Sequence, residues 1–264
     1  MTTIRTPSGL NDESPLTASL DALLTEARHH PAVRHPFLSR FASGDFLDNT
    51  AALRLYSVEY SGYAAWFPRY LRAVIARLDS SQHRDLLLDN LDEEQGVYGD
   101  EDCAELEQAG IDPRSVQGVP HPQLFRRFCH AIGIGNEEIS TPTTAAAEWR
   151  ERFLAFLNSA TPAQAVGALG LGTEYIVRPI YEQLVRGIRQ IGTLQRSEFV
   201  FFELHCLVDD KHQNDLLGIA RDLAREAGGL AGLLSGMQTA LVLRRQFWDQ
   251  LYQRALEQER TNEA

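Results

Sequence analysis

The pattern of apolar and polar positions predicts helices along almost the whole chain. Segments 16–30, 51–78, 81–95, 121–132, 143–159, 162–190, 196–227 and 230–259 repeat apolar residues at steps of three and four, the spacing of one helix face. Strand-type alternation is missing, and 35 leucines stand against 23 valines and isoleucines, a balance that favours helix. We therefore expect an all-α fold.

Proline and glycine mark the breaks in this pattern. Pro68 predicts a kink or a helix junction and Pro179 a bend, because proline removes a backbone donor. Between residues 97 and 120 the periodicity is lost except for a short helical piece at 101–108, so we interpret 97–120 as a surface insertion. Residues 1–14 form a polar N-terminal tail. No linker divides the chain, so we interpret residues 1–264 as a single domain.

Composition narrows the class of protein. The net charge is −11 and no run of lysine or arginine is present, which argues against nucleic acid as a partner. No apolar stretch reaches the ~18 residues of a membrane span, and the polar start carries no apolar signal core. Cys103, Cys129 and Cys206 lie far apart and indicate neither a disulfide framework nor a thiolate zinc site. We expect a cytoplasmic protein without a membrane partner.

The strongest candidate for chemistry is the group His205, Asp209 and His212. At ~100° per residue, the three side chains fall within roughly 60° of one another on one helix face. Imidazole and carboxylate donors suit divalent metals such as iron or manganese. A polar face satisfied by hydrogen bonds alone is the alternative. Flanking apolar residues indicate that the group points inward, where an unpaired charge is unfavourable.

A second candidate lies on the preceding helix, where Glu174, Arg178 and Tyr181 follow one another at steps of four and three. Small residues before Glu174 permit close packing against a neighbouring helix. Arg178 has two interpretations: it pairs with an acid such as Glu174, or it presents its guanidinium to a substrate carboxylate.

Three further residues are candidates from the earlier helices. Glu94 shares a face with Leu87 and Leu91 and is the preferred inward carboxylate, with Glu93 as its alternative. Glu59 lies inside an aromatic stripe, and His121 starts the helix at 121–132. Taken alone, His121 would be a helix-start residue, and a buried Glu59 could be satisfied by tyrosine hydroxyls or an arginine.

Taken in order, segment 90–96 (NLDEEQG), segment 121–128 (HPQLFRRF), Glu174 and the histidine–aspartate group resemble the heme-oxygenase-like diiron oxidases and oxygenases. The resemblance covers roughly residues 55–212. It implies about seven core helices around two Fe²⁺ ions that react with dioxygen as a co-substrate. Carried over by position, it implies a set of metal ligands: Glu94, His121, Glu174, His205, Asp209 and His212, with Glu59 as a further carboxylate. One departure is the spacing of Glu94 and His121, which are 27 positions apart, and the insertion accounts for it.

The resemblance also implies the class of reaction. We expect a diiron oxidase or oxygenase that acts on a small carboxylate-bearing substrate. This is an amino acid or related amine, by N-oxygenation or oxidative C–C or C–N cleavage, or else a fatty acid. Arg178 and Tyr181 are the candidate catalytic residues that orient it. The alternatives are a metal-independent enzyme of the TenA or PQQ-synthase type and a non-catalytic helical interaction protein. A monomer and a homodimer are both compatible with the sequence.

Overall fold

The computed structural model describes the backbone of residues 13–141 and 143–263. Side chains are described over the same ranges except at residues 13, 14, 144, 207–211, 262 and 263. Every regular element in this part of the chain is helical, which confirms the all-α prediction. None of the described helices combines the length and the apolar character needed to cross a membrane. The predicted N-terminal tail lies almost wholly outside the described residues.

The described chain contains α-helices, two short 3₁₀ turns and one π-helix. The α-helices are α1 (Glu13–His29), α2 (Pro36–Ser43), α3 (Asn49–Ala64), α4 (Phe67–Ile75), α5 (Ser81–Glu94), α6 (Asp100–Gln108), α7 (His121–Ala131), α8 (Asn136–Ser140), α9 (Thr144–Ser159), α10 (Pro162–Val166), α11 (Tyr175–Ile191), α12 (Val200–Ala224) and α13 (Gly229–Glu263). The 3₁₀ turns are η1 (Pro113–Ser115) and η3 (Arg196–Glu198), and the π-helix is η2 (Gly167–Glu174).

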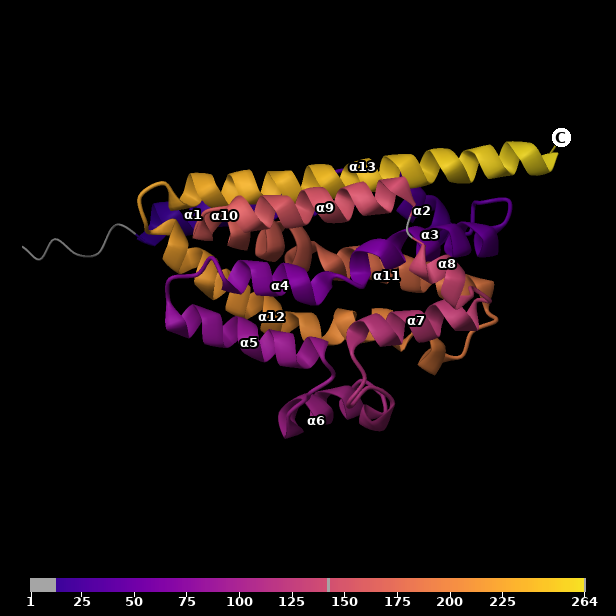
Figure 1. Ribbon diagram of the computed structural model, residues 1–264, viewed down its shortest axis with the longest axis horizontal. Coiled ribbons are helices and arrows are strands. Elements are labelled where there is room, and N and C mark those ends of the chain that lie inside the picture. Colours follow the sequence, from indigo (N-terminus) through magenta and orange to yellow (C-terminus); the bar gives the residue numbers. More distant parts are fainter. Residues whose placement is uncertain (1–12, 142, 264) are drawn as a thin grey trace, which may run out of the picture.

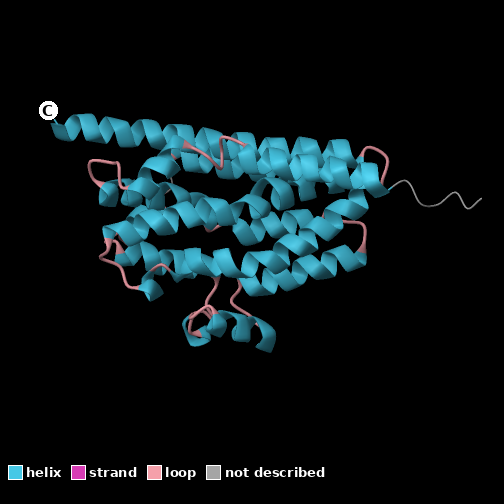
Figure 2. Cartoon of the chain, turned by 180° about the vertical axis from the view of Figure 1, so that it is seen from behind, coloured by secondary structure: helices cyan, strands magenta, loops and turns pink. Residues whose placement is uncertain are grey.

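Most helices lie in layers along the long axis of the molecule (Figure 1). The longest helix, α13, forms one side together with α9 and α10, while α12, α5 and α7 form the opposite side. Helices α3, α4 and α11 lie between these two sides. Figure 2 shows the same arrangement from behind. The inward side chains of all layers join in one continuous hydrophobic core, so the chain folds as a single domain.

Glycines allow α10 and η2 to lie directly against α13. A Cβ added at Gly236 would overlap the carbonyl oxygen of Gln164, and a Cβ at Gly172 would lie 2.7 Å from the Cβ of Ala240. Real Cβ atoms do not approach other atoms so closely, so only glycine permits this contact between the helices. The π-helix η2 is held along α13 in this way and ends at Glu174. Single π-turns inside α-helices are frequent at functional sites.

The structure divides two of the predicted helices. Segment 51–78 is two helices, because α3 ends at Ala64 and α4 begins at Phe67, beside Pro68. Segment 162–190 is interrupted earlier than Pro179: η2 separates α10 from α11, and α11 continues through that proline. The short helices α2 and α8 were not predicted, since eight and five residues are too few to show a helical period.

Segment 97–120 projects from the layers below α5 and α7 and carries α6 and η1 (Figure 1). A narrow neck joins it to the bundle, where the amide of Gly118 donates a hydrogen bond to the carbonyl of Gly96 at 2.7 Å. Gly96 has φ +82°, and a Cβ there would lie 2.5 Å from the backbone nitrogen of Val119. The neck therefore places the end of α5 next to the start of α7, although Glu94 and His121 are 27 positions apart in the chain.

Candidate metal centre

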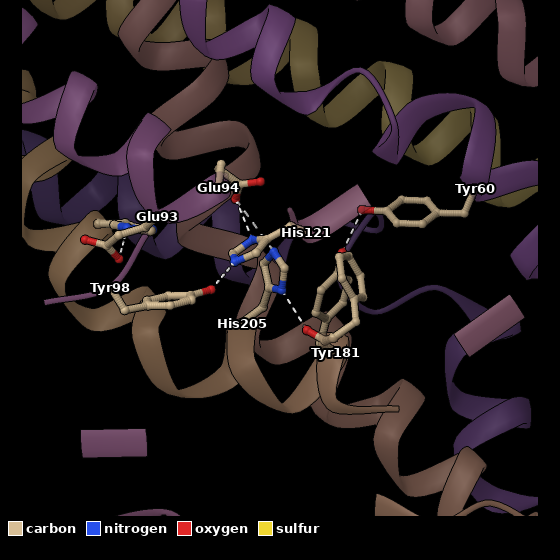
Figure 3. A network of polar contacts seen from close by, with 9 residues as sticks. Tyr60, Glu93, Glu94, Tyr98, His121, Tyr181 and His205 are labelled. Carbon is tan, nitrogen blue, oxygen red and sulfur yellow. Dashed lines mark hydrogen bonds and ion pairs between the residues drawn. The ribbon is translucent and has the colours of Figure 1, made fainter. Parts of the chain in front are cut away.

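Three side chains from three helices converge on one buried point (Figure 3). Glu94 is the last residue of α5, His121 is the first residue of α7, and His205 lies in the second turn of α12. The Oε1 atom of Glu94 lies 2.9 Å from Nδ1 of His121 and 3.9 Å from Nε2 of His205. Ligand atoms of one transition-metal ion lie roughly 3 Å apart, because each is about 2.1 Å from the metal. Small side-chain movements would thus bring all three around one ion.

Each imidazole of this cluster is held in place through the ring nitrogen that does not face Glu94. Nδ1 of His205 donates a hydrogen bond to the carbonyl of Phe201 at 2.7 Å, and burial, then the neighbouring His121, lower the pKa of His205 to about 4. His205 is therefore neutral, and the lone pair of its Nε2 faces Glu94. Nε2 of His121 contacts the hydroxyl of Tyr98 at 2.6 Å, so the Nδ1 atom of the same ring faces Glu94. Metal-binding histidines are oriented in this way, so the donor set fits iron.

A second acid and histidine pair lies on the adjacent face of α5. Nε2 of His212 donates a hydrogen bond to Oε2 of Glu93 at 2.8 Å, and both side chains are buried. Burial acts to lower the pKa of His212, but the hydrogen bond and charge of Glu93, with Glu174 and Glu94, outweigh it and raise that pKa. Within the described part of the chain, no second trio of donors is as closely spaced as the first.

Burial disfavours the charge of each carboxylate at this centre. For Glu94 that effect is outweighed by the charge and hydrogen bond of His121, with smaller contributions from His205 and His212, so the pKa of Glu94 is lowered. For Glu174 burial prevails over the charge of His212 and raises the pKa. Buried acids of this kind gain stability from a bound divalent cation, which supplies the missing positive charge.

A cavity of about 30 Å³ adjoins the cluster. Its polar wall is formed by Glu94, His121, His205, Glu174, Thr173 and Arg244, and its remaining wall by Tyr60, Tyr63, Ala64, Phe67, Pro122, Val177, Tyr181 and Phe201. This volume holds a molecule of about the size of water. Phe67 and Pro122 are partly exposed, so the cavity approaches the surface between the α3–α4 junction and the start of α7.

The structure thus brings most of the predicted site residues together. Glu94, His121, Glu174 and His205 line one cavity, and His212 lies on the same helix as His205 with its imidazole on Glu93. Tyr181 lines the same cavity, and its hydroxyl lies 2.8 Å from that of Tyr60 (Figure 3). The side chain of Asp209 lies outside the described residues, so its role as a ligand stays a prediction.

Two predicted residues lie away from this cavity. The carboxylate of Glu59 is buried, but it forms an ion pair with Arg254 of α13 and accepts a hydrogen bond from Thr143. Helix α3 is buried on nearly every side, so the burial of Glu59 does not imply that it faces the metal cluster. Arg178 is partly exposed and forms an ion pair with Glu182 at 3.3 Å. Its position on α11 is rotated about 40° around the helix axis from Glu174, in the direction away from Tyr181.

Glu59→Gln should lower stability without removing metal. The change neutralises a buried carboxylate and leaves Arg254 without its ion pair, which we expect to reduce the free energy of unfolding by about 1–3 kcal/mol. Denaturant unfolding and iron analysis of the purified variant measure the two effects. Arg254→Gln is the matched control and should lower stability by a similar amount. Loss of iron at unchanged stability would return Glu59 to the ligand set.

Tyr98→Phe should weaken iron binding while it keeps the packing of the ring. The variant removes the hydroxyl that holds Nε2 of His121, and loss of such an orienting partner typically lowers metal affinity about 10–100-fold. Competition with a graded chelator measures the affinity. Tyr175→Phe, a change on the other side of α11 from the cluster, is the control and should leave the affinity as it is. An affinity equal to wild type would show that His121 needs no support from the 97–120 segment.

Several residues of this site were not identified in the sequence. Tyr98 belongs to a segment that the sequence indicated to be a surface insertion. Tyr60 and Tyr63 lie on the helix where only Glu59 was a candidate site residue. Arg244 did leave a signal: it is a cation on the apolar face that Met237, Leu241 and Trp248 mark along α13 at helical spacing.

Comparison with known proteins places this geometry in a family. The family described as iron-containing redox enzymes matches residues 54–245. A protein of Chlamydia muridarum named 4-aminobenzoate synthase is 25% identical over 210 residues, which cover 78% of this chain and 79% of that protein. The family match over residues 54–245 includes α5, α7 and α12, the helices that contribute to the cluster.

Solved structures share the fold at lower identity. A CADD-like protein of unknown function from Nostoc punctiforme superposes with a TM-score of 0.72 at 14% identity, over 91% of this chain and 98% of that chain. A TenA homologue from Pseudomonas syringae pv. tomato superposes with a TM-score of 0.68 at 13% identity, over 96% and 100% of the two chains. The family match spans most of the chain and includes the carboxylate and both histidines of the cluster, and the chain therefore belongs to the iron-containing redox enzymes with a heme-oxygenase-like fold.

Proposed function

We propose that this protein is a non-heme diiron oxidase or oxygenase that uses dioxygen to oxidise a small carboxylate-bearing substrate. The observation that carries the proposal is the buried cluster of Glu94, His121 and His205, whose two imidazoles are each held through the second ring nitrogen. This cluster would hold the first iron ion. The second ion would lie beside it, bound by His212 with Glu93 and Glu174, and by Asp209 from the turn between the two α12 histidines.

The roles of the protein residues follow from their places around the cavity. When bound, ferrous iron supplies the electrons that reduce dioxygen. The protein fixes the ligands, and the apolar wall of Val177 and Phe201 limits the access of water. Burial raises the pKa of Tyr181 well above its usual value, so the phenol stays protonated; because its hydroxyl is hydrogen-bonded to that of Tyr60, one O–H of this pair can donate a hydrogen bond toward the cavity. Tyr181 is thus a candidate to orient the substrate, whereas Arg178 is not part of the proposal.

The proposed substrate class is a small amino acid or related amine. Support comes from the relatives named 4-aminobenzoate synthase, whose named product carries one amino group and one carboxylate. One feature of this site agrees with such a molecule: the cationic side chain of Arg244 in the cavity wall. A fatty acid would share the carboxylate but requires a long apolar channel.

Anaerobic loading with ferrous iron tests the proposal. We expect about two irons per chain, and dioxygen uptake when the loaded protein meets air, because mixed imidazole and carboxylate sites bind ferrous iron and leave positions open. Zinc-loaded protein is the control: zinc has no redox chemistry and should support no uptake. A chain that binds no iron would instead support the metal-independent alternative, in which His205 and His212 act as hydrogen-bonding pocket residues.

A further inference from the structure

Arg244 is a buried cation whose terminal nitrogens make no close hydrogen bond or ion pair, although its charge interacts with the phenol of Tyr60 and the carboxylate of Glu174. Its side chain is 1% exposed, and no other arginine or lysine within the described part of the chain is buried. Neither terminal nitrogen, Nη1 or Nη2, has a hydrogen-bond partner among the described residues. A buried charged group without partners is strongly unfavourable, so native proteins rarely keep one without a ligand, ion or water to satisfy it.

Aromatic rings hold the guanidinium in place. The Cζ atom of Arg244 lies 5.3 Å from the ring centre of Trp149 and 5.7 Å from that of Tyr63, and these two rings stack at 3.7 Å. Burial acts to lower the pKa of Arg244, but the phenols of Tyr63, Tyr60 and Tyr181 outweigh it and raise that pKa. The side chain is therefore a fixed cation. Contacts with ring faces leave the in-plane N–H groups of the guanidinium available.

The free guanidinium lines the same cavity as the metal cluster. Arg244 comes from α13, whereas Glu94, His121 and His205 come from α5, α7 and α12, so the cavity lies between a cation on one side and the candidate ligands on the other. Glu174 shares the cavity, and no ion pair joins it to Arg244.

We propose that Arg244 binds the carboxylate of the substrate and so directs the rest of the molecule toward the metal cluster. This inference rests on the proposed function and names the residue that recognises the carboxylate of the substrate. The two terminal nitrogens match the two oxygens of a carboxylate, and the pair forms two parallel charge-assisted hydrogen bonds. The sequence had offered Arg178 for this role, but Arg178 lines an outer groove with Arg34 and Glu182, away from the cavity.

The small size of the cavity means that lining side chains must move when the substrate binds. A volume of about 30 Å³ holds a molecule of about the size of water, so no carboxylate-bearing molecule fits without rearrangement. The substrate requires side chains to move, and Phe67, Pro122 and His205 are the partly exposed residues of the cavity lining. We therefore expect small carboxylates to require a small displacement of the lining side chains and larger ones to require a larger displacement.

Binding of simple acids and their amides tests the proposal on the full-length protein, as isolated and after anaerobic ferrous loading. The probes are acetate with acetamide and benzoate with benzamide, measured by calorimetry and by the shift in Tm. Wild type should bind at least one carboxylate and prefer it to the matched amide. Arg244→Gln should weaken that binding by at least about 10-fold, because charged hydrogen bonds are lost. Arg244→Lys keeps the charge without the fork and should fall between the two.

Arg178→Gln is the matched control and should bind the carboxylates as wild type does. Equal binding of acid and amide by wild type, or no binding of any probe, would overturn the proposal without reference to a variant, and this comparison remains decisive if Arg244→Gln fails to fold. An unchanged affinity in folded Arg244→Gln would also overturn it. The outcome is independent of the diiron proposal: iron loading can succeed while Arg244 has no effect, and carboxylates can bind the protein as isolated when no iron is taken up.

Discussion

His205→Ala should lose most of its iron and reduce dioxygen uptake by at least about 100-fold, because it removes one of three donors that define the first metal position. The change should disturb the fold little. His205 lies on one face of the 25-residue helix α12, and alanine is the best helix former. Iron analysis after anaerobic loading, dioxygen uptake and helix content by circular dichroism together measure the result.

His130→Ala is the control for that variant. His130 is an exposed histidine of α7 whose imidazole contacts Asn136 at 2.9 Å, far from the cavity lining. We expect its iron content and dioxygen uptake to equal those of wild type. If His205→Ala kept its full iron content, the cluster of Glu94, His121 and His205 would not be the metal site, and the proposed function would lose its main support.

Gly236→Ala should be strongly destabilising, although it adds only one methyl group. The added methyl group would overlap the carbonyl oxygen of Gln164 and lie 2.8 Å from the backbone nitrogen of Ala168, so α13 and the α10–η2 segment must separate. Overpacking against backbone commonly lowers the free energy of unfolding by about 1–3 kcal/mol and occasionally by more. Because η2 ends at Glu174, we also expect weaker iron binding. Thermal unfolding and chelator competition measure the two effects.

Gly218→Ala provides the opposite result in the same experiment. Gly218 lies inside α12, its φ is not positive, and a Cβ there would meet no atom within 4 Å. Alanine at this position should therefore stabilise the protein by about 0.5–1 kcal/mol, since it restricts the unfolded chain and favours helix. A Gly236→Ala variant as stable as Gly218→Ala would mean that the close approach of α13 to α10 and η2 is not required.

Helix positions and the inward face of α12 could be predicted from the sequence, because both depend on local periodicity. Apolar residues, many of them leucine, recur at steps of three and four and so predicted the long helices. The spacing of His205 and His212 placed both on one helix face. The break beside Pro68 was also local, since proline lacks the backbone donor that a helix interior needs.

The partners of each polar side chain could not be predicted in this way. Glu59 and Glu174 both lie on largely buried helices, yet one faces Arg254 and the other faces the metal cavity. Adjacent Glu93 and Glu94 are both buried, and each forms a hydrogen bond with a different histidine. The helix face of α5 alone therefore could not show that both carboxylates belong to the site. Which helix lies against which face is decided by packing over the whole bundle, and that information is not local.

The sequence by itself determined that this chain is a helical protein with an inward group of histidines and acids, because helical period and the cost of burying charge are properties of short segments. Only the tertiary structure decided that Glu94 and His121 meet across the neck at Gly96, that Tyr98 supports His121, and that Arg244 faces the same cavity. These contacts join residues far apart in the chain, and they exist because glycine-lined helix surfaces and a closed neck bring their backbones together.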